Sequence, residues 1–117
     1  EKVDYLGLQD HPLHGVAKKY MRLADSDENL YGHLCSFIVN GSVEDTRRFF
    51  DNLKIIARAT DLGRVKSIAT IPSISTHQQQ GEEGREMAGI PPNMVRLCVG
   101  GEDPTDIIND LDQALKA

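Results

Sequence analysis

Apolar side chains recur with the three- and four-residue spacing of an amphipathic helix in three long segments of the chain. The first predicted helix covers residues 11–23. Asp10 is suited to cap it, and Pro12 lies in its first turn, where a missing N–H does no harm. The face expected to be buried consists of Leu13, Val16, Ala17, Tyr20 and Met21.

Two further helices begin at recognisable caps. Residues 43–58 follow Ser42, and Asp45 stands three positions after it, as in a capping box. Residues 104–115 follow Asp103 as a cap and begin with a proline. Both helices have an apolar face expected to be buried, formed by Val43, Phe49, Phe50, Leu53, Ile56 and Ala57 on the first and by Ile107, Ile108, Leu111, Ala114 and Leu115 on the second.

Short runs rich in β-branched and apolar residues predict three strands, over residues 34–39, 65–70 and 94–99. A short helix over residues 82–88 separates the last two strands. Strands that alternate with helices predict an α/β (α+β) sandwich, in which helices pack on one face of a small, mostly antiparallel sheet. A chain of 117 residues is expected to form one domain, covering residues 1–117.

Charge and composition narrow the class of partner. Acidic residues outnumber basic ones by 18 to 13, and a net charge of −5 without a basic face argues against a nucleic-acid partner. No apolar run approaches the roughly 20 residues that span a bilayer, so no membrane segment is expected. Two widely spaced cysteines, Cys35 and Cys98, are typical of a protein in a reducing cytoplasm.

Arg96 is the first candidate for chemistry, because it lies in the middle of the third predicted strand. Alternation along that strand sends Val95, Leu97 and Val99 to one face and Arg96 to the other. A guanidinium fork held on a rigid strand suits a carboxylate in a bidentate contact. From the strand pattern alone, a solvated arginine or a structural ion pair is the favoured interpretation.

A second candidate is the polar segment over residues 75–80, which crosses between two predicted elements and contains His77. This histidine can serve as a base or as a hydrogen-bonded structural residue. His11, His14 and His33 have no metal-ligand spacing, and the sequence contains no metal site, glycine-rich phosphate loop or nucleophile elbow.

Several short motifs follow one another along the chain. They are Tyr5-Leu6-Gly7-Leu8, His11-Pro12, Asp61-Leu62-Gly63-Arg64, Thr76-His77-Gln78-Gln79 and Val95-Arg96-Leu97-Cys98-Val99-Gly100. In order and spacing they resemble the C-terminal domain of the pyridoxal-phosphate-dependent enzymes of cysteine and methionine metabolism, which have fold type I. This family comprises cystathionine γ-synthases, cystathionine and methionine lyases, and O-acetylhomoserine sulfhydrylases.

The resemblance implies roles for three residues in substrate binding. Arg96 would bind the α-carboxylate of an amino-acid substrate, which favours the functional interpretation of its strand. Asp61 takes the place of a serine or asparagine near that carboxylate, so it is expected to point away, to be paired, or to mark a changed substrate. Thr76 would lie on the loop facing the active site. Ile71 and Cys98 also depart from the family pattern, where His and Ser are usual.

Within the family, Lys66-Ser67 and the segment over residues 76–79 are most similar to O-acetylhomoserine sulfhydrylases. Such an enzyme forms homocysteine from O-acetylhomoserine and sulfide in methionine biosynthesis. A γ-lyase or γ-synthase of the same family is the alternative. The resemblance further implies pyridoxal 5'-phosphate as the cofactor and a homotetramer as the assembly of the whole enzyme.

The family's cofactor lysine lies in a short motif in which Ser or Thr flanks it on both sides, and no lysine of this chain is flanked in that way; the lysines are Lys2, Lys18, Lys19, Lys54, Lys66 and Lys116. We therefore expect the chain to be the C-terminal domain of a larger enzyme, entered midway, with no catalytic or cofactor-binding residue of its own and no activity alone. A stand-alone, non-catalytic ligand-binding module is the alternative from another class.

Overall fold

The computed structural model describes residues 2–74, 81, 83–84 and 90–117. These residues form a five-stranded sheet in the order β1-β2-β5-β4-β3. The elements are β1 (Lys2–Asp4), α1 (His14–Tyr20), β2 (Leu34–Ile38), α2 (Val43–Asp51), β3 (Ala57–Arg58), β4 (Ile68–Thr70), β5 (Met94–Cys98) and α4 (Pro104–Leu115). Strands β3 and β4 run parallel and the other neighbours run antiparallel, so the prediction of a mostly antiparallel sheet is confirmed.

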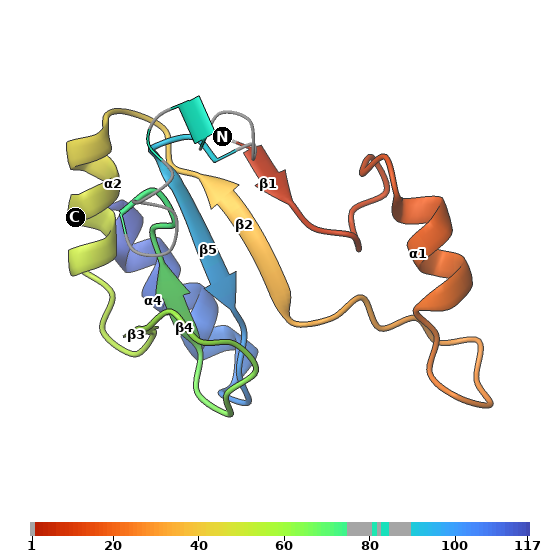
Figure 1. The fold of residues 1–117 in the computed structure, drawn as a ribbon. Coiled ribbons are helices and arrows are strands. Elements are labelled where there is room, and N and C mark those ends of the chain that lie inside the picture. Colours follow the sequence, from red (N-terminus) through yellow and green to blue (C-terminus); the bar gives the residue numbers. More distant parts are fainter. Residues whose placement is uncertain (1, 75–80, 82, 85–89) are drawn as a thin grey trace.

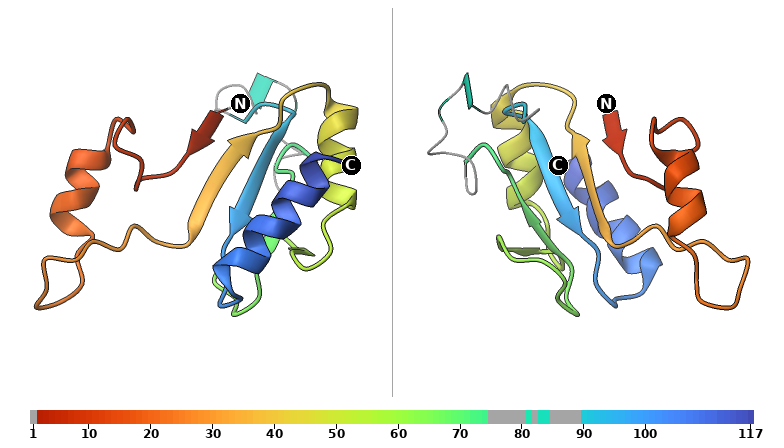
Figure 2. Two further views of the ribbon diagram at one scale, coloured as in Figure 1. Left: turned by 180° about the vertical axis from the view of Figure 1, so that it is seen from behind. Right: turned by 45° about the vertical axis from the view of Figure 1, so that its right-hand side comes forward.

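Helices α2 and α4 lie on the same face of the sheet, as predicted (Figures 1 and 2). Side chains from both helices and from the facing side of the strands form one core. Its buried members are Val39, Phe49, Phe50, Ile56, Ala69, Ile71, Val95, Leu97, Ile107 and Ala114. Burial of these apolar side chains is the main force that holds the two layers together. Neither α2 nor α4 covers the opposite face of the sheet.

Helix α2 begins at the predicted capping box. The Asp45 N–H donates to Ser42 Oγ at 3.1 Å, and the Ser42 N–H donates to Asp45 Oδ2 at 2.8 Å. The predicted end at residue 58 is wrong, because the helix stops at Asp51 with Asn52 as its C-cap. The chain then turns, and residues 57–58 pair with β4 instead of extending the helix.

A buried carboxylate on α4 explains why α2 ends early. Asp110 is 5% exposed, and it accepts the backbone N–H groups of Lys54, Ile55 and Ile56 at 2.8–3.0 Å. These N–H groups would bond to carbonyls one turn earlier if the helix continued. Burial alone would raise the pKa of Asp110, but the three backbone donors, that of Ile56 foremost, together with Gln113, lower it below its ordinary value.

Helix α4 has the predicted bounds, and Asp103 caps it by accepting from the Thr105 N–H at 2.8 Å. Two residues expected to be buried are exposed instead: Ile108 and Leu115 keep 63% and 59% of their surfaces. Each directly follows a buried residue, so it lies about 100° further around the helix, beyond the stripe that faces the sheet.

The first helix differs most from its prediction. It covers residues 14–20 rather than 11–23, and Asp10 does not cap it. Of the face expected to be buried only Ala17 is enclosed, while Leu13, Val16 and Tyr20 are exposed. The reason is its location: α1 lies beyond the β1 edge of the sheet, away from the core (Figure 1).

The strands are shorter than predicted, and two were missed. Strand β4 begins at residue 68 rather than 65, and the short edge strands β1 and β3 have too few residues to show an alternating pattern. The segment over residues 75–80 and most of the helix predicted over residues 82–88 lie outside the described residues.

Candidate functional site

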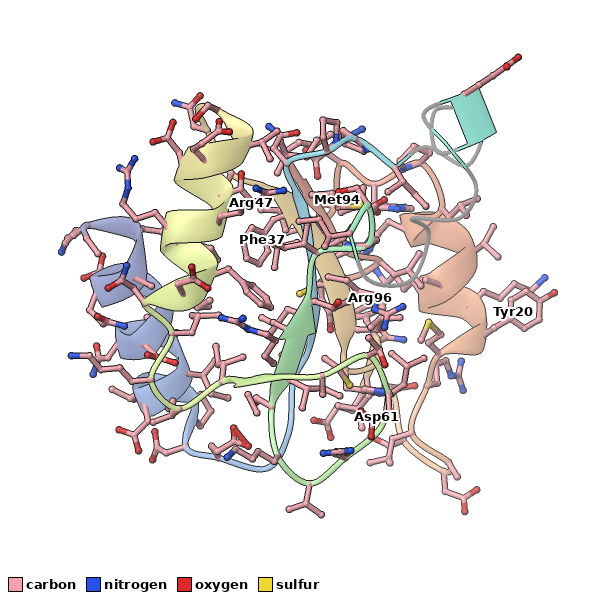
Figure 3. The ribbon with its side chains drawn as sticks, turned by 60° about the vertical axis from the view of Figure 1, so that its left-hand side comes forward. Tyr20, Phe37, Arg47, Asp61, Met94 and Arg96 are labelled. Carbon is pink, nitrogen blue, oxygen red and sulfur yellow. The ribbon has the colours of Figure 1, made fainter. Side chains whose placement is uncertain are left out.

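Arg96 extends from the face of the sheet that α2 and α4 do not cover. In β5 the neighbours Val95 and Leu97 are 1% and 4% exposed and face the helices, while Arg96 is half-buried on the other side. Figure 3 shows Phe37 on the helix side of the sheet and Arg96 on the opposite side. The alternation predicted for this strand is therefore confirmed.

Strand register places Arg96 in a row of polar residues that crosses the open face. Ser36 on β2 and Thr70 on β4 are its direct partners on either side. Asp4 on β1 pairs in turn with Ser36. Because directly paired residues in an antiparallel ladder share a face, all four side chains belong to the same surface.

A cavity of about 420 Å³ lies over this row. Its polar lining comes from Asp4, His11, Ser36 and Arg96. The remaining lining is largely apolar, from Tyr5, Leu6, Leu13, Leu34, Cys35, Pro72, Ile90 and Met94. An apolar pocket with a few converging polar groups is the usual form of a site for a small ligand.

Among the described residues, the guanidinium of Arg96 makes a single hydrogen bond. Its Nη2 donates to the Thr60 carbonyl oxygen at 2.8 Å. Within the described part of the chain, no carboxylate forms an ion pair with it. A guanidinium has five N–H donors, so one bond to a carbonyl leaves both charge and donors for an anionic ligand.

The loop over residues 60–64 is fastened to the open face of β5 at two points. Besides the bond from Arg96 to Thr60, the Gly63 N–H donates to Cys98 Sγ at 3.2 Å. Gly63 has a φ of +72°, which a side chain would disfavour. Cys98, a departure from the family pattern, is 2% exposed and serves as the acceptor that holds this turn.

Asp61 lies in this loop, on the same side of the sheet as Arg96 (Figure 3). It does not line the cavity. Its carboxylate is paired with the Arg64 guanidinium, and both side chains are about half exposed. Of the three possibilities for Asp61, the structure therefore shows a paired carboxylate. Thr76 lies outside the described residues.

A buried serine holds the chain at the C-terminal end of β5. Ser67 is fully buried; its Oγ accepts the Gly100 N–H at 2.8 Å, and its own N–H donates to Glu102 at 2.7 Å. The bonds from Ser67 lower the pKa of Glu102. A Cβ at Gly100 would lie 2.2 Å from the Val65 carbonyl oxygen, so no other residue fits this approach. These contacts hold the chain directly after β5, which ends at Cys98.

Sequence reasoning missed the pair formed by Asp4 and His11. The Leu13 N–H donates to His11 Nδ1 at 3.0 Å, so the ring proton of the neutral imidazole is on Nε2. That Nε2–H donates to Asp4 Oδ1 at 2.7 Å. Asp4 reaches the cavity through β1, which is only three residues long and has no recognisable strand pattern, so this pair could not be predicted from the sequence.

The described residues form neither a cluster of metal ligands nor a membrane-spanning helix. No three His, Cys, Asp or Glu side chains among them gather where they could hold a metal ion. None of the described helices is long and apolar enough to cross a bilayer.

Residues 1–116 match the family described as Cys/Met metabolism PLP-dependent enzyme. The chain belongs to this family. Cystathionine γ-lyase of Dictyostelium discoideum is 39% identical to it over 98% of the chain, and L-methionine γ-lyase of Fusobacterium nucleatum is 39% identical over 99%. The chain spans about 28% of the length of each of these relatives.

Among solved structures, an O-acetylhomoserine (thiol)-lyase described as putative, from Campylobacter jejuni, superposes with a TM-score of 0.89 at 34% identity. It covers the whole chain, which in turn covers 26% of that protein. Cystathionine γ-synthase of Xanthomonas oryzae, solved with cystathionine, superposes with a TM-score of 0.85 at 32% identity. The match covers 99% of this chain and 28% of that protein. The predicted family and fold type are thus confirmed.

The family depends on pyridoxal phosphate. The described residues that line the cavity do not fit that cofactor, because none of them is a lysine that could bond to its aldehyde. They do present a guanidinium, which suits the carboxylate of an amino acid.

Proposed function

We propose that this chain is the C-terminal domain of a longer pyridoxal-phosphate-dependent enzyme and that Arg96 binds the α-carboxylate of its amino-acid substrate. The observation that carries the proposal is a half-buried guanidinium at a cavity wall without a carboxylate partner among the described residues. Burying a charged group without a counter-charge costs free energy, which a bound carboxylate would return.

A purely structural role accounts less well for Arg96. Its only bond among the described contacts goes to the carbonyl of Thr60, an exposed residue that water could satisfy equally well. The same loop is already held through Gly63 and Cys98. The bond to Thr60 instead orients the guanidinium, so less rotamer entropy is lost when a ligand binds.

The two other predicted site residues take secondary roles in this proposal. Asp61, held by Arg64, stays beside the Arg96 site without neutralising it. For Thr76 we propose a place on the loop that faces the active site, as the family resemblance implies. Catalytic groups and the cofactor lysine come from another part of the enzyme, which acts as a homotetramer in the cytoplasm.

For the reaction, we propose that the enzyme forms homocysteine from O-acetylhomoserine and sulfide. Support comes from Lys66-Ser67 and from the likeness to the Campylobacter jejuni protein. The second candidate is a γ-lyase, favoured by the 39% identity to cystathionine and methionine γ-lyases. Product analysis separates them: homocysteine from O-acetylhomoserine plus sulfide supports the first, whereas a 2-oxo acid released from cystathionine or methionine alone supports the second.

The proposal that this chain is one domain of a longer enzyme can be tested separately, with the isolated chain. The purified 117-residue chain is mixed with pyridoxal phosphate and treated with borohydride, and its lysines are mapped by mass spectrometry. We expect no stoichiometric adduct at a single lysine and no turnover. A single modified lysine together with activity would contradict the assignment, and would mean that the chain is an enzyme by itself.

A further inference from the structure

The connection from β3 to β4 crosses the open face of the sheet, the face that α2 and α4 leave uncovered. The two strands run parallel, so the chain has to return along the sheet between Arg58 and Ile68. Parallel neighbours usually require a crossover of about a dozen residues or more, most often with a helix. Here residues 59–67 make the return without a helix. The crossover therefore depends on its contacts with the strands beneath it.

Two hydrogen bonds set the path of this crossover along β5. Its first part lies at the level of Arg96, whose Nη2 donates to the Thr60 carbonyl oxygen at 2.8 Å. Three residues later, the Gly63 N–H donates to Cys98 Sγ at 3.2 Å. Arg96 and Cys98 are two positions apart on β5, so their side chains share the open face. The crossover thus runs beside β5 from Arg96 toward the end of the strand.

Cys98 is the rigid one of these two anchors. Its short side chain is 2% exposed, whereas Arg96 has a long, half-buried side chain whose ordering costs entropy. Among the described hydrogen bonds, the one from Gly63 to Cys98 is the only one, apart from that of Arg96 itself, that ties residues 60–64 to the sheet. The position of the Thr60 carbonyl therefore depends on Cys98.

We infer that Cys98 is a positioning residue for the substrate carboxylate, acting through the crossover and not by contact with the ligand. By holding Gly63, it fixes the Thr60 carbonyl that orients the Arg96 guanidinium. This inference rests on the proposed function, in which Arg96 binds the α-carboxylate. A guanidinium already held in one orientation loses little rotamer entropy when a ligand binds. With the crossover released, carboxylates should bind more weakly and kcat should not change.

Three substitutions of Cys98 separate its role as an acceptor from its role in packing. Cys98→Ala removes both the acceptor and part of the buried volume. Cys98→Val fills the space but cannot accept a hydrogen bond, so it should match Cys98→Ala and serves in its place if the smaller side chain prevents folding. Cys98→Ser keeps an acceptor, but a C–O bond is shorter than a C–S bond, so it should retain only part of the effect.

The test uses the full-length holoenzyme with L-norleucine and L-norleucinamide as competitive inhibitors, because these two ligands differ only in the carboxylate. Cys98→Ala and Cys98→Val should raise Ki of the acid about three- to tenfold, the effect expected when one long side chain has to be ordered on binding. Ki of the amide and kcat should stay within about twofold of the wild type. A merely structural role would weaken both ligands or lower kcat.

A double variant shows whether Cys98 acts through Arg96. In an Arg96→Ala background, Cys98→Val should not raise Ki of the acid further, because the guanidinium that it positions is gone. Val39→Ala, which shortens a buried side chain in the core on the helix side of the sheet, is the control and should change neither Ki.

The outcomes for the two proposals are distinct. If Arg96→Ala weakens binding of the acid but Cys98→Val does not, or if Cys98→Val weakens it equally with and without Arg96, the inference about Cys98 is wrong and the proposed function stands. If Arg96→Ala alone leaves Ki of the acid unchanged, the proposed function itself fails.

Discussion

The carboxylate of Asp61 is paired with the guanidinium of Arg64, three residues further along the same loop. The preceding residue, Thr60, accepts the hydrogen bond from Arg96. Arg64 therefore offsets a negative charge beside the guanidinium that we assign to the substrate carboxylate. We expect Arg64→Ala to raise KM for an amino-acid substrate about two- to fivefold with little change in kcat, because an exposed pair contributes up to about 1 kcal/mol.

The double variant Asp61→Asn with Arg64→Ala is the control for this prediction. It removes both charges, so steady-state kinetics should return KM to within about twofold of the wild type. A KM that is unaffected by Arg64→Ala, or that stays raised in the double variant, would show that the pair serves only the loop.

Asp110 is expected to be among the most important residues for stability. Its carboxylate accepts three backbone N–H groups of the segment after α2, and Asp110→Asn would turn an NH2 group toward those donors. We expect urea unfolding to show a loss of about 2–3 kcal/mol. Asp112→Asn, on the same helix but exposed, should cost less than about 0.5 kcal/mol. Equal losses in both variants would contradict the role of Asp110.

The same carboxylate makes stability depend on pH. Its pKa in the folded chain lies below the unfolded value of about 3.9, so protons bind preferentially to the unfolded chain. The contribution of Asp110 is therefore complete above that value and is lost as the pH falls through the folded pKa. Unfolding free energies of Asp110→Asn should fall less steeply with acid than those of Asp112→Asn; identical slopes would exclude Asp110 as a source.

The chain after β5 passes very close to the segment before β4 at Gly100, and an alanine substitution there tests this contact. Gly15, which has free space around it, is the control. An alanine Cβ at Gly100 would meet the Val65 carbonyl oxygen at 2.2 Å, whereas nothing lies within 4 Å of one at Gly15. Thermal or urea unfolding should show a loss of about 1–3 kcal/mol for Gly100→Ala. Gly15→Ala, inside a helix, should be neutral or stabilising by about 0.5–1 kcal/mol. Comparable tolerance at both sites would be the contrary result.

The features that could be predicted from the sequence are those that neighbouring residues determine. The capping box of Ser42 and Asp45, the cap at Asp103 and the face of Arg96 all follow from neighbouring residues, and all are found in the structure. The end of α2 could not be predicted in this way, because Asp110, more than fifty residues away, takes the N–H groups that would continue the helix.

In the candidate site, too, local features could be predicted from the sequence and contacts between distant segments could not. Alternation placed Arg96 on one face, but only strand register shows that Ser36 and Asp4 share its row. The apolar spacing of residues 13–21 predicted a buried helix face, yet α1 lies beside the sheet with Val16 and Tyr20 exposed. Periodicity reports that a helix is amphipathic and does not report what covers it.

The central claim, that Arg96 holds the substrate carboxylate, is tested most directly by kcat/KM of the full-length enzyme with Arg96→Ala and Arg96→Lys. Loss of a bidentate charge-assisted contact should cost roughly 2–4 kcal/mol, which is about a 30- to 1,000-fold drop for Arg96→Ala. Arg96→Lys should recover only part, since an ammonium group keeps the charge and loses the fork. Arg48→Ala, an exposed arginine on α2, is the control and should be neutral. Wild-type kcat/KM in a folded Arg96→Ala enzyme would contradict the claim and make Arg96 a structural residue.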